Sequence, residues 1–137
     1  MKSSLFLDTS FTIAQVSPKD QFNQKARFWS EKIQAEQISL ITTQAILLEI
    51  GNALSKQHFR QIAVTLLEYF AVSESIEIIP LTDDLYNKAF NFFRSRPDKD
   101  WGLVDCISFV VMTERNIPSA LTADEHFIQA GFTALLR

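Results

Sequence analysis

The sequence predicts an α/β protein with a parallel sheet, and three observations carry this prediction. Short apolar segments alternate with longer segments of helical periodicity along the 137 residues. The short segments are continuous apolar runs, which is typical of strands covered by helices on both faces. Hydrophobic residues make up 47% of the chain, with only three Gly and four Pro, so it can build a core with few long loops. We expect one domain over residues 1–137.

In the first half of the chain, apolar runs such as SLFLD and QISLI predict strands. The first helix is predicted because apolar residues recur at spacings of four, three and four from Phe22 to Ile33. A threonine before the second helix can cap it. The predicted elements are a strand at Ser4–Asp8, a helix at Lys19–Glu36, a strand at Gln37–Ile41, a helix from Thr42 or Thr43 to about Ser55, and a helix from about Phe59 to Val72.

Proline and acidic residues mark the element boundaries in the second half. Pro80 ends one strand, and the helix before Pro97 must stop near Arg96. The acids after Thr82 suit the positive end of a helix. The predicted elements are a strand at Ile76–Ile79, a helix from Thr82 to about Arg96, a helix at Leu103–Asn116, a strand at Ser119–Thr122, a short helix at Asp124–Ala130 and a strand at Phe132–Leu135.

Composition bounds the compartment and the partners. The single cysteine, Cys106, allows no internal disulfide, which suits a reducing cytosol. Asp8 interrupts the apolar start of the chain before it reaches the length of a signal peptide core, and no apolar run is long enough to span a membrane. We therefore expect a cytoplasmic protein without a membrane partner. The net charge of −3 lacks the basic signature of a nucleic-acid binder.

Two aspartates occupy equivalent places at the ends of predicted strands. Asp8 ends the strand LFLD, and Asp124 follows the strand SALT after one residue. Ligands of open parallel sheets bind beyond the carboxyl ends of the strands, where the strand order reverses. If the first and fourth strands are neighbours there, Asp8 and Asp124 converge.

Two further acids lie on predicted helices. Glu49 borders the apolar face formed by Ile46, Ile50 and Leu54, and Asp105 lies in a first turn whose N–H groups favour a carboxylate. Each acid has a simpler interpretation: Asp105 as a first-turn acid, Asp124 as a helix cap, and Glu49 as an edge residue. Asp8 is the hardest to explain in this way, because a carboxylate at the end of an apolar strand needs a partner.

Four acids in separate elements fit a metal site better than four coincidences. Carboxylates suit Mg²⁺ or Mn²⁺, and the site could hold one or two ions. Such a site can bind a phosphate through the metal, so RNA or DNA remains a possible partner despite the net charge.

The motifs of this chain resemble those of the PIN domain, specifically the small ribonucleases of VapC-type toxins. The segments that carry the resemblance are LFLDTS at Leu5–Ser10, TTQAILLEIGNAL at Thr42–Leu54, KDWGLVDCISF at Lys99–Phe109 and ALTADEHFIQAGF at Ala120–Phe132. They occur in the family's order and cover nearly the whole chain. The family's W-S-L-T-D reads WGLVD here, with Gly102 and Val104 replacing two hydroxyl residues.

The resemblance implies a three-layer α/β/α fold with strand order 3-2-1-4-5 and a Mg²⁺- or Mn²⁺-dependent endoribonuclease. It also implies a toxin of a type II toxin–antitoxin pair that forms a homodimer and is silenced by a small antitoxin. The four acids match the family's catalytic and metal-binding positions, with Asp8 and Asp105 the most regular ligands. The residues carried over are Asp8, Glu49, Asp105 and Asp124 for catalysis and metal binding, and Ser10, Thr43 and Asp100 in supporting roles.

Several other residues have competing interpretations. His126 could contact a phosphate, but we interpret it as a surface or packing residue because the family's nucleophile is water. Cys106 is interpreted as a small buried residue, and Trp101 as a seal over the core instead of a platform for a base. The nearest basic cluster to the site is a candidate RNA contact, or else a solvated helix end; it consists of Arg94, Arg96 and Lys99.

Four other functions are alternatives. An aspartyl-phosphate phosphatase would need a second Asp two residues after Asp8, where Ser10 stands. A phosphate-receiving signalling domain would need acids before the end of the first strand and a late lysine, and the sequence has neither. A PIN-like nuclease outside a toxin–antitoxin pair, or a PIN-like fold that only binds a partner, is compatible with the sequence.

Overall fold

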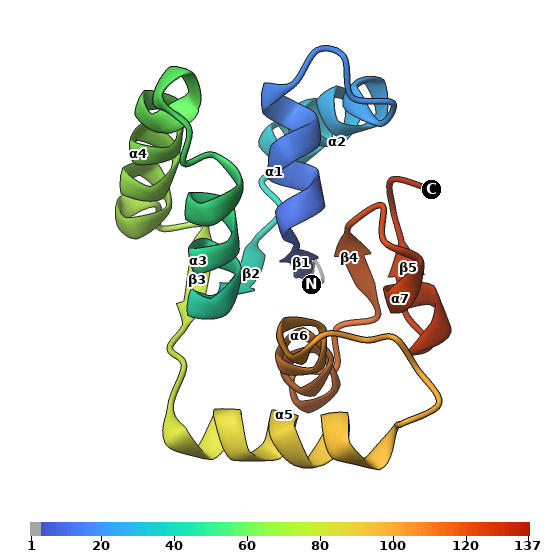
Figure 1. Ribbon diagram of the computed structural model, residues 1–137. Coiled ribbons are helices and arrows are strands. Elements are labelled where there is room, and N and C mark those ends of the chain that lie inside the picture. The colour runs from blue at the N-terminus through green and yellow to red at the C-terminus, as the bar shows by residue number, and fades with distance from the viewer. Residues whose placement is uncertain (1–3) are drawn as a thin grey trace.

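The computed structural model describes residues 4–137 as five strands and seven helices (Figure 1). The strands alternate with helices along most of the chain, as the apolar pattern predicts. In order, the elements are β1 (Leu5–Leu7), α1 (Thr9–Val16), α2 (Asn23–Glu36), β2 (Leu40–Thr43), α3 (Gln44–Ala53), α4 (Gln57–Val72), β3 (Ile76–Ile79), α5 (Asp83–Ser95), α6 (Leu103–Glu114), β4 (Ser119–Leu121), α7 (Glu125–Gln129) and β5 (Thr133–Ala134).

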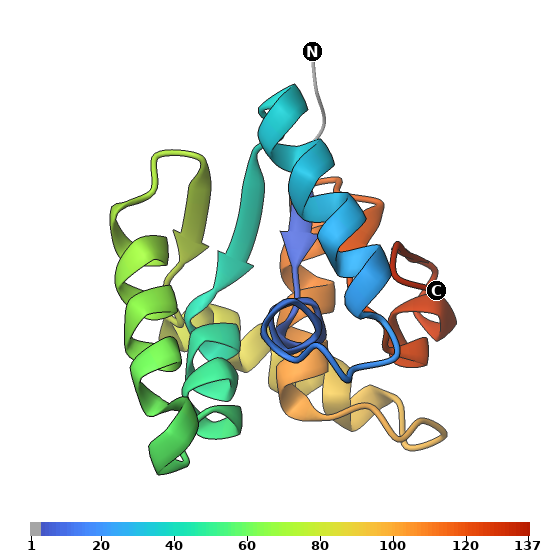
Figure 2. The same ribbon diagram turned by 90° about the horizontal axis from the view of Figure 1, so that it is seen from above.

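All five strands are parallel, in the order β3-β2-β1-β4-β5, which confirms the predicted topology. The central strand β1 pairs with β2 on one side, Leu5 opposite Leu40, and with β4 on the other, Phe6 opposite Ala120. Figures 1 and 2 show α1, α2 and α4 on one face of the sheet and α5 and α6 on the other. The chain therefore forms the expected three layers.

The core lies on both faces of the central strands. Phe6 and Leu7 of β1 are completely or almost completely buried, as are Ala120 and Leu121 of β4. Between the sheet and α5, the rings of Phe92, Trp101 and Phe109 pack against one another. Among the helices of residues 4–137, none combines the length and apolar character needed to cross a membrane.

Three local features differ from the sequence-based expectation. The helix predicted from Lys19 begins at Asn23. The helix α1 was not predicted, although it follows directly on β1 with Phe11, Thr12 and Ala14 buried. The second strand lies at Leu40–Thr43 instead of Gln37–Ile41, because Gln37 adopts a left-handed conformation (φ 52°) that ends α2. The shift brings both threonines into the strand, and Thr43 then caps α3 by accepting a bond from the Ile46 N–H.

Candidate metal centre

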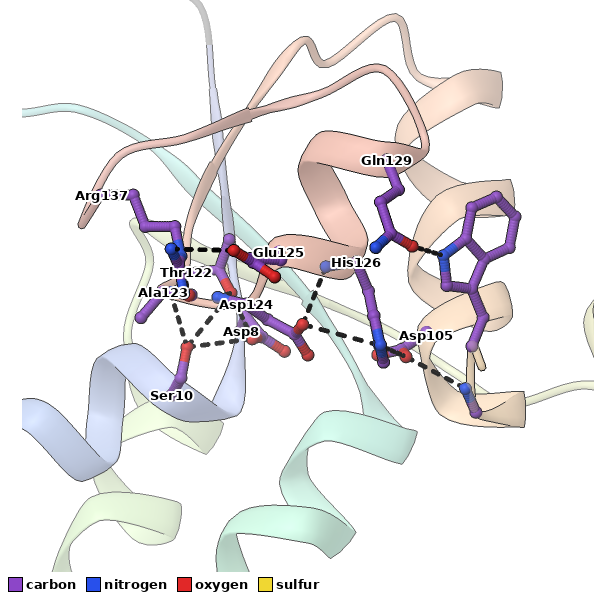
Figure 3. Close-up of polar contacts among 12 residues, drawn as sticks. Asp8, Ser10, Asp105, Thr122, Ala123, Asp124, Glu125, His126, Gln129 and Arg137 are labelled. Atoms are coloured by element: carbon purple, nitrogen blue, oxygen red, sulfur yellow. Dashed lines mark hydrogen bonds and ion pairs between the residues drawn. The ribbon is translucent and has the colours of Figure 1, made fainter. Parts of the chain in front are cut away.

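The candidate site lies where β1 and β4 end side by side. These two strands are paired, and the Asp8 N–H donates to the Leu121 carbonyl at 3.3 Å. From this point the chain turns to α1 and β2 on one side and to α7 and β5 on the other, so the strand order reverses here. Asp8 and Asp124 converge as the sequence predicts (Figure 3).

Hydroxyl groups surround the buried carboxylate of Asp8. Thr122 Oγ1 donates to Asp8 Oδ2 at 2.7 Å, and Ser10 Oγ donates to the same oxygen at 3.1 Å. Burial raises the pKa of Asp8 to about 6, against the opposing effect of the bonds from Thr122, the Thr9 backbone and Ser10. The negative charge of Glu49 raises this pKa further. The surroundings of Asp8 therefore disfavour its charged form.

Glu49 approaches the site from the side of α3. Its Oε1 accepts a bond of 2.8 Å from Thr9 Oγ1, which fixes the side chain beside the end of β1. Burial raises the pKa of Glu49, the bond from Thr9 lowers it, and the charges of Asp105 and Asp124 raise it. The electrostatic effects link all four predicted acids, since Glu49 also acts on Asp8.

Asp105 lies in the first turn of α6, where two donors meet one of its oxygens. The Gly102 N–H donates to Asp105 Oδ2 at 3.0 Å, and His126 Nδ1 lies 2.9 Å from the same oxygen. Asp105 therefore binds a backbone N–H at the start of α6, in agreement with its interpretation as a first-turn acid. It also faces the other acids. Both roles are compatible, because only Oδ2 takes part in these two bonds.

The expectation that His126 is a surface or packing residue is wrong. Its ring joins Asp105, and its backbone N–H donates to Asp124 Oδ1 at 2.8 Å, so that Asp124 caps α7. The ligand atoms of Asp105, Asp124 and His126 all lie within 4.8 Å of one another, close enough to hold a metal ion. In the sequence, the only sign of this role is that His126 follows two residues after Asp124. This spacing does not show in which direction the ring points.

The charges of the site are not balanced by basic side chains. Within residues 4–137, the ion pairs of the four acids involve only His126, at 2.9 Å from Asp105 and 3.5 Å from Asp124. Burial lowers the pKa of His126, but the bond to Asp105 and the charges of Asp124, Asp105 and Asp100 outweigh this and raise it. The site attracts positive charge as a whole.

Two contacts that the sequence did not predict hold the segments of the site together. Trp101 is buried as expected, and its Nε1–H donates to Gln129 Oε1 at 3.0 Å, which links the start of α6 to α7. Arg137 Nε donates to the Ala123 carbonyl at 2.6 Å and its guanidinium pairs with Glu125. These contacts flank Asp124 on both sides (Figure 3).

The supporting and basic residues have less uniform surroundings. Ser10 bonds directly to Asp8, whereas Thr43 caps α3, the helix that carries Glu49. Asp100 is exposed and contributes its charge to His126. The basic residues form local contacts: Arg96 pairs with Asp98 at 2.9 Å and lies over the Trp101 ring together with Lys99, and Arg94 bonds to Asn91.

The other sequence-based interpretations agree with the structure. Cys106 is completely buried, and its neighbours on α6 belong to the core. Gly102 has an ordinary extended conformation (φ −76°), and a Cβ added there would lie 3.9 Å from Asp105 Oδ2. The position therefore has room for the serine that the related motif carries.

Comparison with known proteins agrees with this geometry. The model of the PIN domain family matches residues 5–133. A curated relative, the 23S rRNA-specific endonuclease VapC20 of Mycobacterium tuberculosis, is 27% identical over 129 residues, covering 93% of this chain and 95% of the relative. A crystal structure of that protein, described as a Sarcin-Ricin loop cleaving toxin, superposes with a TM-score of 0.82 at 25% identity, covering 95% of this chain and 97% of the other.

A more distant structure shares the fold alone. FitAcB from Neisseria gonorrhoeae has a TM-score of 0.64 at 14% identity and covers 95% of this chain and 94% of the other. The family match extends from β1 to β5 and includes all four acids of the site. The chain therefore belongs to the PIN-domain family of nucleases.

Proposed function

We propose that this protein is a metal-dependent endoribonuclease of the VapC type, which acts in the cytoplasm as the toxin of a type II toxin–antitoxin pair. The observation that carries the proposal is the meeting of four carboxylates from four elements at the junction of β1 and β4. Such a concentration of negative charge is unfavourable unless a cation binds.

The donor set fits Mg²⁺ or Mn²⁺. The acids supply hard oxygen ligands, and the carboxylates of Asp105 and Asp124 lie within 4.8 Å of each other. Asp8 and Asp105 are the proposed main ligands, and Glu49 and Asp124 complete the site for one ion or two. A divalent ion bound by these acids would activate water and offset the negative charge of a phosphodiester.

The residues of the chain orient this chemistry. Ser10 and Thr122 fix Asp8, and Thr9 fixes Glu49, so both carboxylates are held before substrate arrives. In the proposed reaction a water oxygen attacks phosphorus, the water proton passes to a carboxylate, and the bond to the leaving oxygen of the RNA breaks. Glu49 suits the role of proton acceptor, because the bond from Thr9 holds its carboxylate beside the end of β1.

RNA is the proposed substrate, with a structured ribosomal RNA hairpin as the first candidate to test. One relative described above, VapC20, supports this choice by the substrate in its name and in the description of its structure. Arg94, Arg96 and Lys99 are proposed phosphate contacts at the rim of the site. Arg96 would have to exchange its ion pair with Asp98 for one with a phosphate, so its contribution to RNA affinity should fall with added salt.

A small antitoxin protein and a second copy of the chain are the proposed protein partners. In support, a groove of about 680 Å³ runs between α2 and α4, with Ile33, Leu66 and Phe70 among its lining residues. Exposed apolar side chains continue along α4 at Val64, Tyr69 and Val72. A small open reading frame next to the gene would favour a toxin–antitoxin pair over a nuclease that acts alone.

The function is tested with purified protein, free of any inhibitor, and total RNA in Mg²⁺ or Mn²⁺. We expect discrete cleavage products that disappear in EDTA and in the variants Asp8→Asn and Asp105→Asn. Asp20→Asn is a matched control, because this carboxylate accepts a bond from the Phe22 N–H and is not one of the four acids of the site. Undiminished cleavage in both site variants would contradict the metal mechanism, and binding of RNA without cleavage would favour a binding module.

A further inference from the structure

His126 connects two acids that belong to different elements. Its backbone N–H binds Asp124 Oδ1 at 2.8 Å, and its ring Nδ1 binds Asp105 Oδ2 at 2.9 Å (Figure 3). One residue thus spans the gap between α7 and α6. We propose that His126 is a positioning residue that holds Asp105 and Asp124 at the spacing needed for metal binding; this inference rests on the proposed function.

The chemistry of the contact assigns the donor. An ionised carboxylate only accepts hydrogen bonds, so the Nδ1 of His126 must carry the hydrogen that Asp105 Oδ2 accepts. The Gly102 N–H donates to the same oxygen at 3.0 Å. Two donors from two directions fix the orientation of the carboxylate, and the other oxygen, Oδ1, is not used by either bond.

The backbone that carries the ring is fixed by packing. The next residue, Phe127, is completely buried and packs against Phe6 and Phe109. The backbone of α7 is therefore anchored in the core at this point, and His126 reaches Asp105 from a fixed place in the fold. The side chains of His126 and Asp105 are 30% and 20% exposed, so water screens their bond only in part.

A direct role as metal ligand or phosphate contact is the alternative for this ring. Mg²⁺ prefers oxygen ligands. A histidine that is hydrogen-bonded to a carboxylate ligand orients that carboxylate, and the histidine itself does not need to bind the metal. A phosphate contact would use the other ring nitrogen, Nε2. The two ring nitrogens therefore separate the two roles, and side chains that replace only one nitrogen can distinguish them.

Three variants test the role of the Nδ1 atom. An asparagine amide can donate from nearly the position of Nδ1, whereas a glutamine amide reaches the position of Nε2. Mn²⁺ binding is measured without RNA, from the loss of the electron paramagnetic resonance signal of free Mn²⁺. We expect His126→Ala and His126→Gln to weaken Mn²⁺ binding about 10- to 100-fold, and His126→Asn to stay within about threefold of the natural protein.

The controls separate this inference from the function on which it rests. His58→Ala removes the only other histidine, which is exposed at the start of α4, and should leave Mn²⁺ binding unchanged. If the natural protein does not bind Mn²⁺, or if Asp105→Asn binds it equally well, the proposed function fails. If the natural protein binds Mn²⁺ and His126→Ala binds it equally, only the positioning role fails.

Two further outcomes would overturn the inference in favour of a direct contact. Rescue by His126→Gln but not by His126→Asn would assign the role to Nε2. In the His58→Ala background His126 is the sole histidine, so ¹⁵N-labelled histidine tests it alone. A strong ¹⁵N coupling to bound Mn²⁺ would make the ring a ligand, whereas the positioning role predicts none. Thermal unfolding of each metal-free variant verifies that it is folded.

Discussion

The metal centre has two halves that meet the same electrostatic problem in different ways. In the buried half, Asp8 is 7% exposed and receives bonds from the hydroxyls of Ser10 and Thr122. In the open half, Asp105 and Asp124 are more exposed and share His126 as a partner that can carry positive charge. The buried half orients its acid without neutralising it, while the open half partly neutralises its acids.

The difference shows where the site gives up folding stability for function. Neutral donors compensate the desolvation of Asp8 only in part, because its pKa remains raised to about 6. A carboxylate gains most from binding a cation when few hydrogen bonds or positive groups stabilise its charge in the absence of that cation. The buried half should therefore contribute most to metal affinity and cost most in the stability of the metal-free protein.

The largest expected effect is on RNA cleavage. Asp8→Asn removes a charge from the buried half, and Asp105→Asn removes one from the open half. Each variant should lower the cleavage rate by at least about 100-fold, because each removes a proposed metal ligand. The rate is measured with a labelled RNA hairpin under single-turnover conditions. A loss confined to one of the two variants would show that the halves do not act on a common ion.

The second effect is on stability and has the opposite sign. Asp8→Asn removes the buried charge and should raise the free energy of unfolding of the metal-free protein at pH 7 by roughly 1–3 kcal/mol. Asp105→Asn in the open half lacks this gain, because His126 and Gly102 already satisfy the carboxylate. Urea unfolding in EDTA compares the two variants, and a lower urea midpoint for Asp8→Asn would contradict the difference.

The pH dependence of the natural protein follows from the same carboxyl group. The pKa of Asp8 is raised from 3.8 in the unfolded chain to about 6 in the folded chain, so the folded state binds the proton more tightly. The contribution of Asp8 to stability is therefore highest below about pH 4 and is lost as the pH rises through 6. Comparing natural protein with Asp8→Asn across this range isolates the contribution of Asp8; identical pH profiles would contradict it.

An effect on stability of similar size and opposite sign is expected from the hydroxyl of Thr122. Thr122→Val removes the shorter of the two hydroxyl bonds to Asp8 and an acceptor for the Asp124 N–H, and should destabilise the protein by about 1–3 kcal/mol. It should also raise the pKa of Asp8 further. Thr12→Val is the matched control, because Thr12 Oγ1 is buried without a partner among the described residues. Equal loss in both variants would mean that only packing is involved.

The smallest effect tests the open half at Gly102. Gly102→Ser restores the serine of the related motif at a position with ordinary backbone angles and space for a Cβ. A serine cap of α6 should stabilise the protein by a few tenths of a kcal/mol and leave Mn²⁺ binding unchanged. The urea midpoint and the Mn²⁺ titration measure both, and a loss of Mn²⁺ affinity would show that a hydroxyl here disturbs Asp105.

The sequence was sufficient to predict the sheet and the elements that carry the acids. Strand ends are visible as apolar runs that stop at a polar residue, and this pattern correctly located Asp8 and Asp124 beside each other. The helix α1 was missed because its eight residues mix Thr, Ser and branched side chains whose local preference is weak. Its helical conformation depends on packing against α2 and α3, which no short window reveals.

The side-chain network was the part that the sequence could not predict. The ring of His126 reaches Asp105 across 21 residues, and Ser10 meets Thr122 across 112. Such contacts depend on side-chain rotation and on the exact approach of two elements. The strand β2 illustrates the same limit, since the left-handed Gln37 moved its start to Leu40.

The bond between Trp101 and Gln129 gives this protein a built-in optical probe. The chain has two tryptophans, and Trp101 is 4% exposed and tied at 3.0 Å to the helix that follows Asp124. With Trp29 replaced by Phe, the remaining indole would emit from a position between the two segments that hold Asp105 and Asp124. Its emission wavelength and lifetime would then report any change in the separation of those segments, in real time and without an added label.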